Sequence, residues 1–223
     1  MSEGYPDIPE ASIPGGWQLH GRSEDRLFDA GAASVTGRTV LYADAEIETA
    51  LDAAGTGELL GPLSGTDAGR DRENRLVGID TVAPFAFATA LSFRPALAPG
   101  IGPAMVFPVI LTEARRAFAR DFRARGFESV DRERRQQIRT ETGDRARLTR
   151  YTAVHPLAPD TPADRLRVEG WLAVWTREDA FRVAGGAYPT KGLTELLAGQ
   201  ETPPATDPSS FRSDLLDLVR AIR

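Results

Sequence analysis

Apolar residues recur every three or four positions in two stretches of the chain, which is the spacing of one face of an α-helix. The first stretch covers residues 108–126, where Pro108 suits the start of a helix and Gly126 suits its end. Its apolar stripe consists of Leu111, Ala114, Phe118 and Phe122. The second stretch closes the sequence, and we expect Ser209 or Ser210 to cap its helix. Its apolar stripe consists of Phe211, Leu215, Leu218 and Ile222.

A shorter helix is expected after Asp44, because aspartate is a favourable residue at a helix N-cap. Glu46 and Glu48 lie in its first turn, where the helix dipole favours negative charge. The helix is expected to continue through about Ala54 and to end at Gly55.

The other apolar segments are short and rich in β-branched and aromatic residues, which favours strands. Residues 26–33 and 35–43 are expected to pair, and residues 85–93 form either a buried strand or a short helix. Short turns separate the later strands, which therefore run antiparallel to their neighbours. These later strands are expected at residues 127–133, 136–141, 145–155, 166–175 and 181–188.

The segment "WLAVW", residues 171–175, is apolar at every position. Because successive side chains of a strand alternate, Trp171 and Trp175 would point to one face of the sheet. Leu172 and Val174 would point to the other face, so both faces must be covered. The two long helices are available for this, and the expected fold is α+β: an antiparallel sheet with helices on both faces, an α/β/α sandwich.

Glycine and proline mark two segments without helical or strand spacing. Residues 1–16 are expected to form a flexible N-terminal tail, and residues 17–223 a single domain. Within that domain, residues 55–75 are expected to form a long mobile loop. The loop lacks the lysine of a phosphate-binding loop, which argues against a nucleotide site there.

Composition excludes several classes of chemistry. The chain has no cysteine, and its two histidines, His20 and His155, have no partner at ligand spacing, so we expect no metal and no cofactor. No Gly-x-Ser-x-Gly motif is present, and Lys191, the one lysine, lies in an expected loop. Catalysis is therefore not favoured. The sequence also shows no signal peptide and no apolar run of about 18 residues, so we expect a cytoplasmic protein without a membrane partner.

Three segments carry a resemblance to known proteins: "ARGFESV", "GDRARLTRYTAVHP" and "RVEGWLAVWTREDAFRVAGGAYP". Over residues 25–190 the chain resembles a family of uncharacterised conserved proteins from haloarchaea. The order of helix, strand, turn, long meander and terminal helix is also similar to the Mog1/PsbP-like sandwich. The resemblance implies the layered fold. It implies no activity and no catalytic residues.

Aromatic residues are expected to gather on one face of the last two strands, beside Ala184 and Gly186. Such a face forms either packed core, where a glycine lets a helix approach, or a slot for a small molecule. Core packing is the favoured interpretation, and the slot is the alternative. We expect the ligand-binding residues of such a slot to be Tyr151, His155, Trp171, Trp175 and Tyr188.

Basic residues concentrate in residues 115–150, which hold 12 arginines and six acids in a chain of net charge −5. Nucleic acid could use this charge, and its contacts would be Arg116, Arg120, Arg135 and Arg139. However, the acids alternate with the arginines, which favours surface ion pairs, and the pI of 5.2 opposes a nucleic-acid binder.

The sequence therefore favours a non-catalytic binding or interaction module that acts on a protein partner or a small molecule. An enzyme or carrier that uses a slot on the aromatic face is the alternative. Weak nucleic-acid binding through residues 115–150 is the second alternative.

Overall fold

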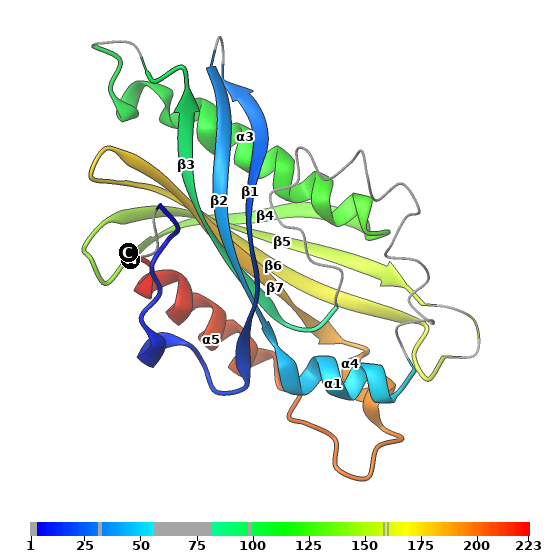
Figure 1. Cartoon of the computed structure of the whole chain (residues 1–223). Coiled ribbons are helices and arrows are strands. Elements are labelled where there is room, and N and C mark those ends of the chain that lie inside the picture. The colour runs from blue at the N-terminus through cyan, green and yellow to red at the C-terminus, as the bar shows by residue number, and fades with distance from the viewer. Residues whose placement is uncertain (1–3, 31–32, 56–81, 98–99, 158, 160) are drawn as a thin grey trace.

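The computed structural model describes residues 4–30, 33–55, 82–97, 100–157, 159 and 161–223. They form an α+β fold in which seven antiparallel strands make one sheet in the order β1-β2-β3-β7-β6-β5-β4 (Figure 1). The strands are β1 (Trp17–Ala30), β2 (Ala33–Asp44), β3 (Phe85–Arg94), β4 (Glu128–Arg139), β5 (Arg145–Pro156), β6 (Arg165–Arg177) and β7 (Ala180–Lys191). The α-helices are α1 (Ala45–Ala53), α3 (Pro103–Ala124), α4 (Leu193–Leu197) and α5 (Pro208–Ala221).

The sheet is built from two antiparallel meanders that meet in its middle. Strands β1 to β3 follow one another, as do β4 to β7, and β3 pairs with β7 to join them. The turn between β6 and β7 contains Glu178 and Asp179, whose φ angles of 48° and 61° are both positive. Two such residues give a turn whose twist matches the flanking strands. The expected antiparallel sheet is confirmed, and residues 85–93 lie in a strand.

The helix after Asp44 forms as its sequence predicts. The Asp44 carboxylate accepts hydrogen bonds from the backbone N–H groups of Glu46 and Ile47, both at 3.1 Å. These bonds satisfy two of the donors that a helix start leaves free. Gly55, just beyond α1, has a φ of +68°, which glycine adopts without strain.

The expected start of α3 at Pro108 is wrong, because the helix begins five residues earlier, at Pro103. A proline inside a helix removes one backbone hydrogen bond. The added turn is held to the sheet by Phe107, whose ring stacks on that of Phe181 with centroids 6.2 Å apart. The helix end is confirmed: Gly126 follows the cap with a φ of +79°.

Two further boundaries differ from the sequence prediction. The N-cap of α5 is Asp207 and not a serine, since its carboxylate accepts from the Ser209 backbone N–H at 3.0 Å and from the hydroxyls of Ser209 and Ser210. The two strands expected at residues 127–133 and 136–141 are one strand, β4, which continues through two register shifts. A bulge accommodates an extra residue without ending a strand.

Both faces of β6 are buried, as the segment "WLAVW" predicts. A side chain on Gly170 would meet the rings of Phe118 and Phe122 of α3 at 3.0–3.3 Å. A side chain on Gly186, which pairs with Trp171, would meet Leu215 of α5 at 2.7 Å. The face that carries Gly170 is called the α3 face below, and the other the Trp171 face.

The flexible tail predicted for residues 1–16 stays a prediction. Within its described part, Asp7 and Arg223 exchange two backbone hydrogen bonds, of 3.4 and 2.9 Å, and Ile8 is buried. The mobile loop predicted at residues 55–75 lies outside the described residues, apart from Gly55. In the part of the chain that is described, no helix has the length and apolar character that a membrane crossing requires.

Candidate functional site

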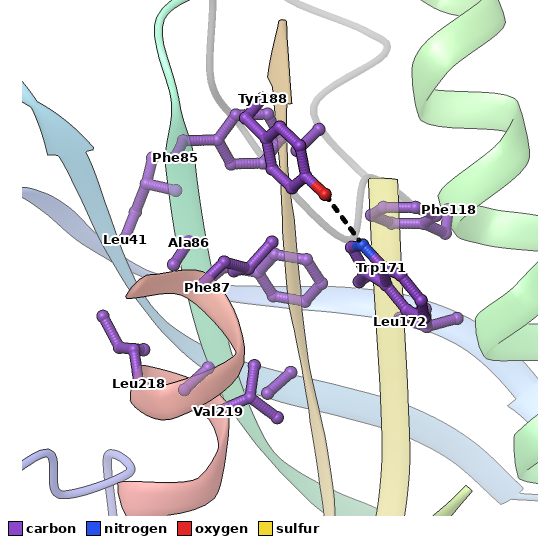
Figure 2. Packing of buried hydrophobic residues seen from close by; sticks show 14 of the residues in the cluster. Leu41, Phe85, Ala86, Phe87, Phe118, Trp171, Leu172, Tyr188, Leu218 and Val219 are labelled. Atoms are coloured by element: carbon purple, nitrogen blue, oxygen red, sulfur yellow. Dashed lines mark hydrogen bonds between the residues drawn. The ribbon is translucent and has the colours of Figure 1, made fainter. Parts of the chain in front are cut away.

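The Trp171 face contains a buried acid, Glu169, with three partners. The Trp171 indole Nε1 donates to its carboxylate at 2.8 Å, and the Tyr188 hydroxyl donates to the same oxygen. Arg150 forms an ion pair with the other carboxylate oxygen. Figure 2 shows the Tyr188 hydroxyl directed at the Trp171 indole nitrogen, from which it accepts a hydrogen bond of 3.3 Å. The acid is thus fully partnered, as a buried charge requires.

The aromatic residues of this face lie in the core. Trp171, Trp175 and Tyr188 are 1%, 0% and 3% exposed. Burial raises the pKa of Tyr188 well above its usual value, and the hydrogen bond to Glu169 raises it further. Core packing, the favoured interpretation of these residues, agrees with this burial; their role in binding a ligand stays a prediction.

Tyr151 and His155 do not share this face, so the expected grouping of five residues is wrong. In β5, Arg150 lies opposite Trp171, whereas Tyr151 lies opposite Gly170. Tyr151 and His155 therefore belong to the α3 face. The Tyr151 hydroxyl donates to the backbone carbonyl of Arg115 at 3.3 Å, and the His155 ring packs against a phenylalanine. A shift of one residue in strand register moves every side chain to the opposite face.

Strand β4 separates its charges by face. Its pairing with β5 places Arg132 and Arg135 on the α3 face. Glu133 forms an ion pair with Arg150 at 3.5 Å, on the Trp171 face. Asp131 pairs with a residue of that same face. Within β4, Arg132 and Arg135 are therefore on the opposite face from Asp131 and Glu133, because side chains of a strand alternate between faces.

Four arginines meet on the α3 face without an acid. Arg132 and Arg135 come from β4, Arg147 from β5 and Arg115 from α3. None of the four forms an ion pair with an acid among the described residues. The Arg115 Nε donates to the hydroxyl of Thr149, which is completely buried, at 3.0 Å. This bond fixes the direction of the Arg115 guanidinium group while its two terminal nitrogens remain available.

The positive charges of this cluster repel one another. Burial lowers the pKa of Arg115, and the positive charges of Arg135, Arg132 and Arg147 lower it further. Burial also raises the pKa of Tyr151 to about 12, an effect that the positive charges of Arg115, Arg132, Arg123 and Arg135 oppose. Like charges at short distance repel one another, and no described acid balances them.

The arginines border a groove of about 420 Å³ between α3 and the β4–β5 pair. Its volume lies within the range of small-molecule sites. One wall is apolar and consists of Phe107, Pro108 and Leu111. The other side is polar and consists of Arg115, Arg135, Arg147, Gln136 and Gln137. This surface, together with Arg132 beside it, is called the arginine groove below.

The residues predicted to contact nucleic acid are dispersed. Arg135 lines the arginine groove, whereas Arg116 is exposed and bound to Glu113 at 2.6 Å. Arg139 donates to the backbone carbonyl of Gly143 at 3.0 Å, and Arg120 is exposed on α3. A role for these residues in binding nucleic acid stays a prediction. The grouping of the four arginines into one groove was not predicted from the sequence. The alternation of side chains along β4 could have predicted that Arg132 and Arg135 share a face, but not that Arg115 of α3 lies over them.

The described histidine, aspartate and glutamate side chains form no group of three or more that could hold a metal ion. Fold and site together define an α+β protein with a cationic groove at one end of an antiparallel sheet. The chain belongs to the family described as Domain of unknown function (DUF6517), whose model matches residues 5–223. No curated protein and no solved structure matches the chain.

Proposed function

We propose that this protein is a non-catalytic binding module that holds an organic anion in the arginine groove. The observation that carries the proposal is the convergence of four arginines that no described acid neutralises. Arg150, on the opposite face of β5, has two glutamate partners by contrast. An anion in the groove would relieve the repulsion within the cluster.

The chemistry of the groove suits a carboxylate, phosphate or sulfate group. A guanidinium group presents parallel N–H donors that match two oxygens of such an anion. Arg115 is already oriented by Thr149, so little conformational freedom is lost when an anion binds. Gln137, which pairs with Arg147 on the same face, adds an amide donor to the groove.

The same lining argues against catalysis. The groove is lined by guanidinium groups, amides and apolar side chains. Arginine stays protonated in proteins, and an amide is neither a general base nor a nucleophile, so this set offers no group for proton transfer or covalent chemistry. It offers binding alone.

We also propose that the fold has three layers, in which the antiparallel sheet lies between α3 and α5. Support comes from Gly170, which faces two rings of α3, and from Gly186 on the other face, which faces α5. The view in Figure 1, where the strands run between these two helices, also supports it. Such an arrangement would retain the similarity to the Mog1/PsbP-like sandwich.

Titration calorimetry with inorganic phosphate at low ionic strength tests the function. We expect phosphate to bind the wild-type protein and to bind Arg135→Ala about tenfold more weakly, since one charged hydrogen bond is lost. The control is Arg26→Ala, which removes an exposed arginine from β1 at the far edge of the sheet and should bind like the wild type.

Two results would overturn the proposal. One is an absence of phosphate and sulfate binding, and the other is an equal loss of affinity in both variants. Duplex DNA that binds more tightly than phosphate, and that loses affinity in Arg116→Ala, would favour the nucleic-acid alternative instead. Arg116 lies outside the lining of the groove, so this variant separates the two.

A further inference from the structure

Exposed apolar side chains gather next to the arginine groove. Among the described residues, the large hydrophobic side chains that are exposed are Leu19 (46%), Ile101 (41%), Met105 (68%) and Val109 (44%). Met105 and Val109 lie one turn apart on α3, and Ile101 lies just before the helix. Single exposed hydrophobic residues are common, but three of these four lie between residues 101 and 109.

This apolar surface is continuous with the apolar wall of the groove. Leu111 and Pro108 line the groove, and Met105 follows at the next interval of three residues along α3. Residues three apart on a helix are neighbours on its surface. Pro108 is itself exposed, so the apolar path runs from Leu111 inside the groove to Met105 on the outer side of the helix.

The charged and apolar parts lie in order along α3. Arg115 follows Leu111 by one helical turn, so the cationic cluster lies at one end of the path and Met105 at the other. Met105 and Arg115 are ten positions apart along α3, which corresponds to about 15 Å at 1.5 Å per residue. A ligand that matches this order has an anionic head and an unbranched apolar chain that extends away from it.

We infer that the ligand of the arginine groove is a single-chain anionic amphiphile. Its head group contacts Arg115 and Arg135, and its hydrocarbon chain lies along Leu111, Pro108 and Met105. The inference rests on the proposed function, because it names the class of the anion that the groove holds. A path one helix stripe wide has room for one chain, and the cationic end supplies the charge complementarity.

The test is titration of the whole protein with alkyl sulfates of increasing length, each below its micelle concentration, with inorganic sulfate as the bare head group. We expect affinity to rise about fourfold for each methylene group that becomes buried. Arg135→Ala should weaken binding of every member, including inorganic sulfate.

A second pair of variants distinguishes binding of the ligand's hydrocarbon chain from binding of its anionic head group. Met105→Ser should leave the affinity for inorganic sulfate unchanged and should reduce the gain with chain length by severalfold. The matched control is Leu19→Ser, which also removes an exposed apolar side chain, on the edge strand β1. It should leave the whole series unchanged, and both positions are exposed enough to keep the fold intact.

The outcomes distinguish the inference from the proposed function. Sulfate binding with no dependence on chain length would overturn the inference and leave the anion site standing. Absence of binding for every member, inorganic sulfate included, would overturn both. Chain-length dependence that Leu19→Ser reduces as much as Met105→Ser would show general detergent binding and would also refute the inference. Binding to anionic vesicles but not to monomeric alkyl sulfate would replace the single ligand by a lipid surface.

Discussion

The Trp171 face and the arginine groove lie on opposite faces of β5. They differ in whether their arginines are paired with acids. On the Trp171 face, Arg150 pairs with Glu133 and Glu169, and Glu169 accepts two further hydrogen bonds. In the groove, Arg115 and Arg135 face other arginines. Two acids neutralise Arg150, whereas no described acid neutralises the arginines of the groove. A cluster of like charges beside a groove is the better candidate for a binding site.

The aromatic and apolar residues divide in the same way. The indole rings of Trp171 and Trp175 are buried in the core, although large aromatics beside small residues also suit a ligand slot. The apolar wall of the groove is only partly covered, and it continues onto exposed Met105. Burial distinguishes these two sets more clearly than residue type does, and mutation can test the distinction.

The largest expected effect is that of Trp175→Ala on stability. The ring is completely buried, so its removal should lower the free energy of unfolding by about 3–5 kcal/mol. Trp175→Phe is the matched control: the indole Nε1 has no hydrogen-bond partner among the described residues, so phenylalanine loses no bond to them and should cost about 1 kcal/mol. Urea unfolding measures both. A near-neutral Trp175→Ala would show that this face is an open slot. It would contradict the distinction between a buried Trp171 face and a partly exposed groove.

The second effect is that of Glu169→Ala, which should cost about 3 kcal/mol. The variant leaves the Arg150 guanidinium, the Trp171 N–H and the Tyr188 hydroxyl without their acceptor. Glu133→Ala is the control, because Glu133 is exposed and its ion pair with Arg150 is longer, so its loss should cost under 1 kcal/mol. Equal costs in urea unfolding would contradict a buried, fully partnered acid.

The third effect concerns alkaline pH. The pKa values of Tyr188 and Tyr151 are raised above 10.0 in the folded protein, the latter to about 12. Well below pH 10 both tyrosines are protonated in the folded and unfolded states, and their contribution is complete. Above pH 10 the unfolded chain loses these protons first, so stability should decline as pH rises towards 12.

Tyr188→Phe checks which group is responsible for the decline. The variant cannot ionise at this position, so its stability should fall less steeply between pH 9 and pH 11 than that of the wild type. Tyr5→Phe serves as the control, because Tyr5 is only partly buried, and its slope should match that of the wild type. Identical slopes for Tyr188→Phe and the wild type would refute the assignment.

Local patterns in the sequence were sufficient to predict most elements of the fold. The stripe of Phe211, Leu215 and Leu218 is a short-range signal, and all three residues are buried on α5. The start of α3 was not predictable in this way. Pro108 resembles a first-turn proline, but the contact between Phe107 and Phe181 extends the helix, and that contact joins segments far apart in the chain.

The candidate site depended on information that the sequence does not carry locally. The side of the sheet on which Tyr151 lies follows from the register between β5 and β6. An error of one residue in this register places its side chain on the opposite side. The arginine groove needs Arg115 of α3 to lie over Arg135 and Arg147 of the sheet. In sequence these arginines alternate with acids and resemble a solvated surface, whereas the pleat of β4 separates the two signs.

The smallest expected effect has the opposite sign. Arg135→Ala removes one charge from a cluster that repels itself, so it should raise the free energy of unfolding by about 0.5 kcal/mol at low salt. Arg26→Ala should have no such benefit, since Arg26 is paired with Asp29 at 2.7 Å. The gain should shrink when sodium chloride screens the repulsion, and it should reverse in phosphate, which stabilises the wild type by binding to the intact cluster. Urea unfolding in the two salts measures this. If Arg135→Ala is less stable than the wild type at low salt, the cluster contributes to folding like the pairs of the Trp171 face, and the reason to assign it a ligand disappears.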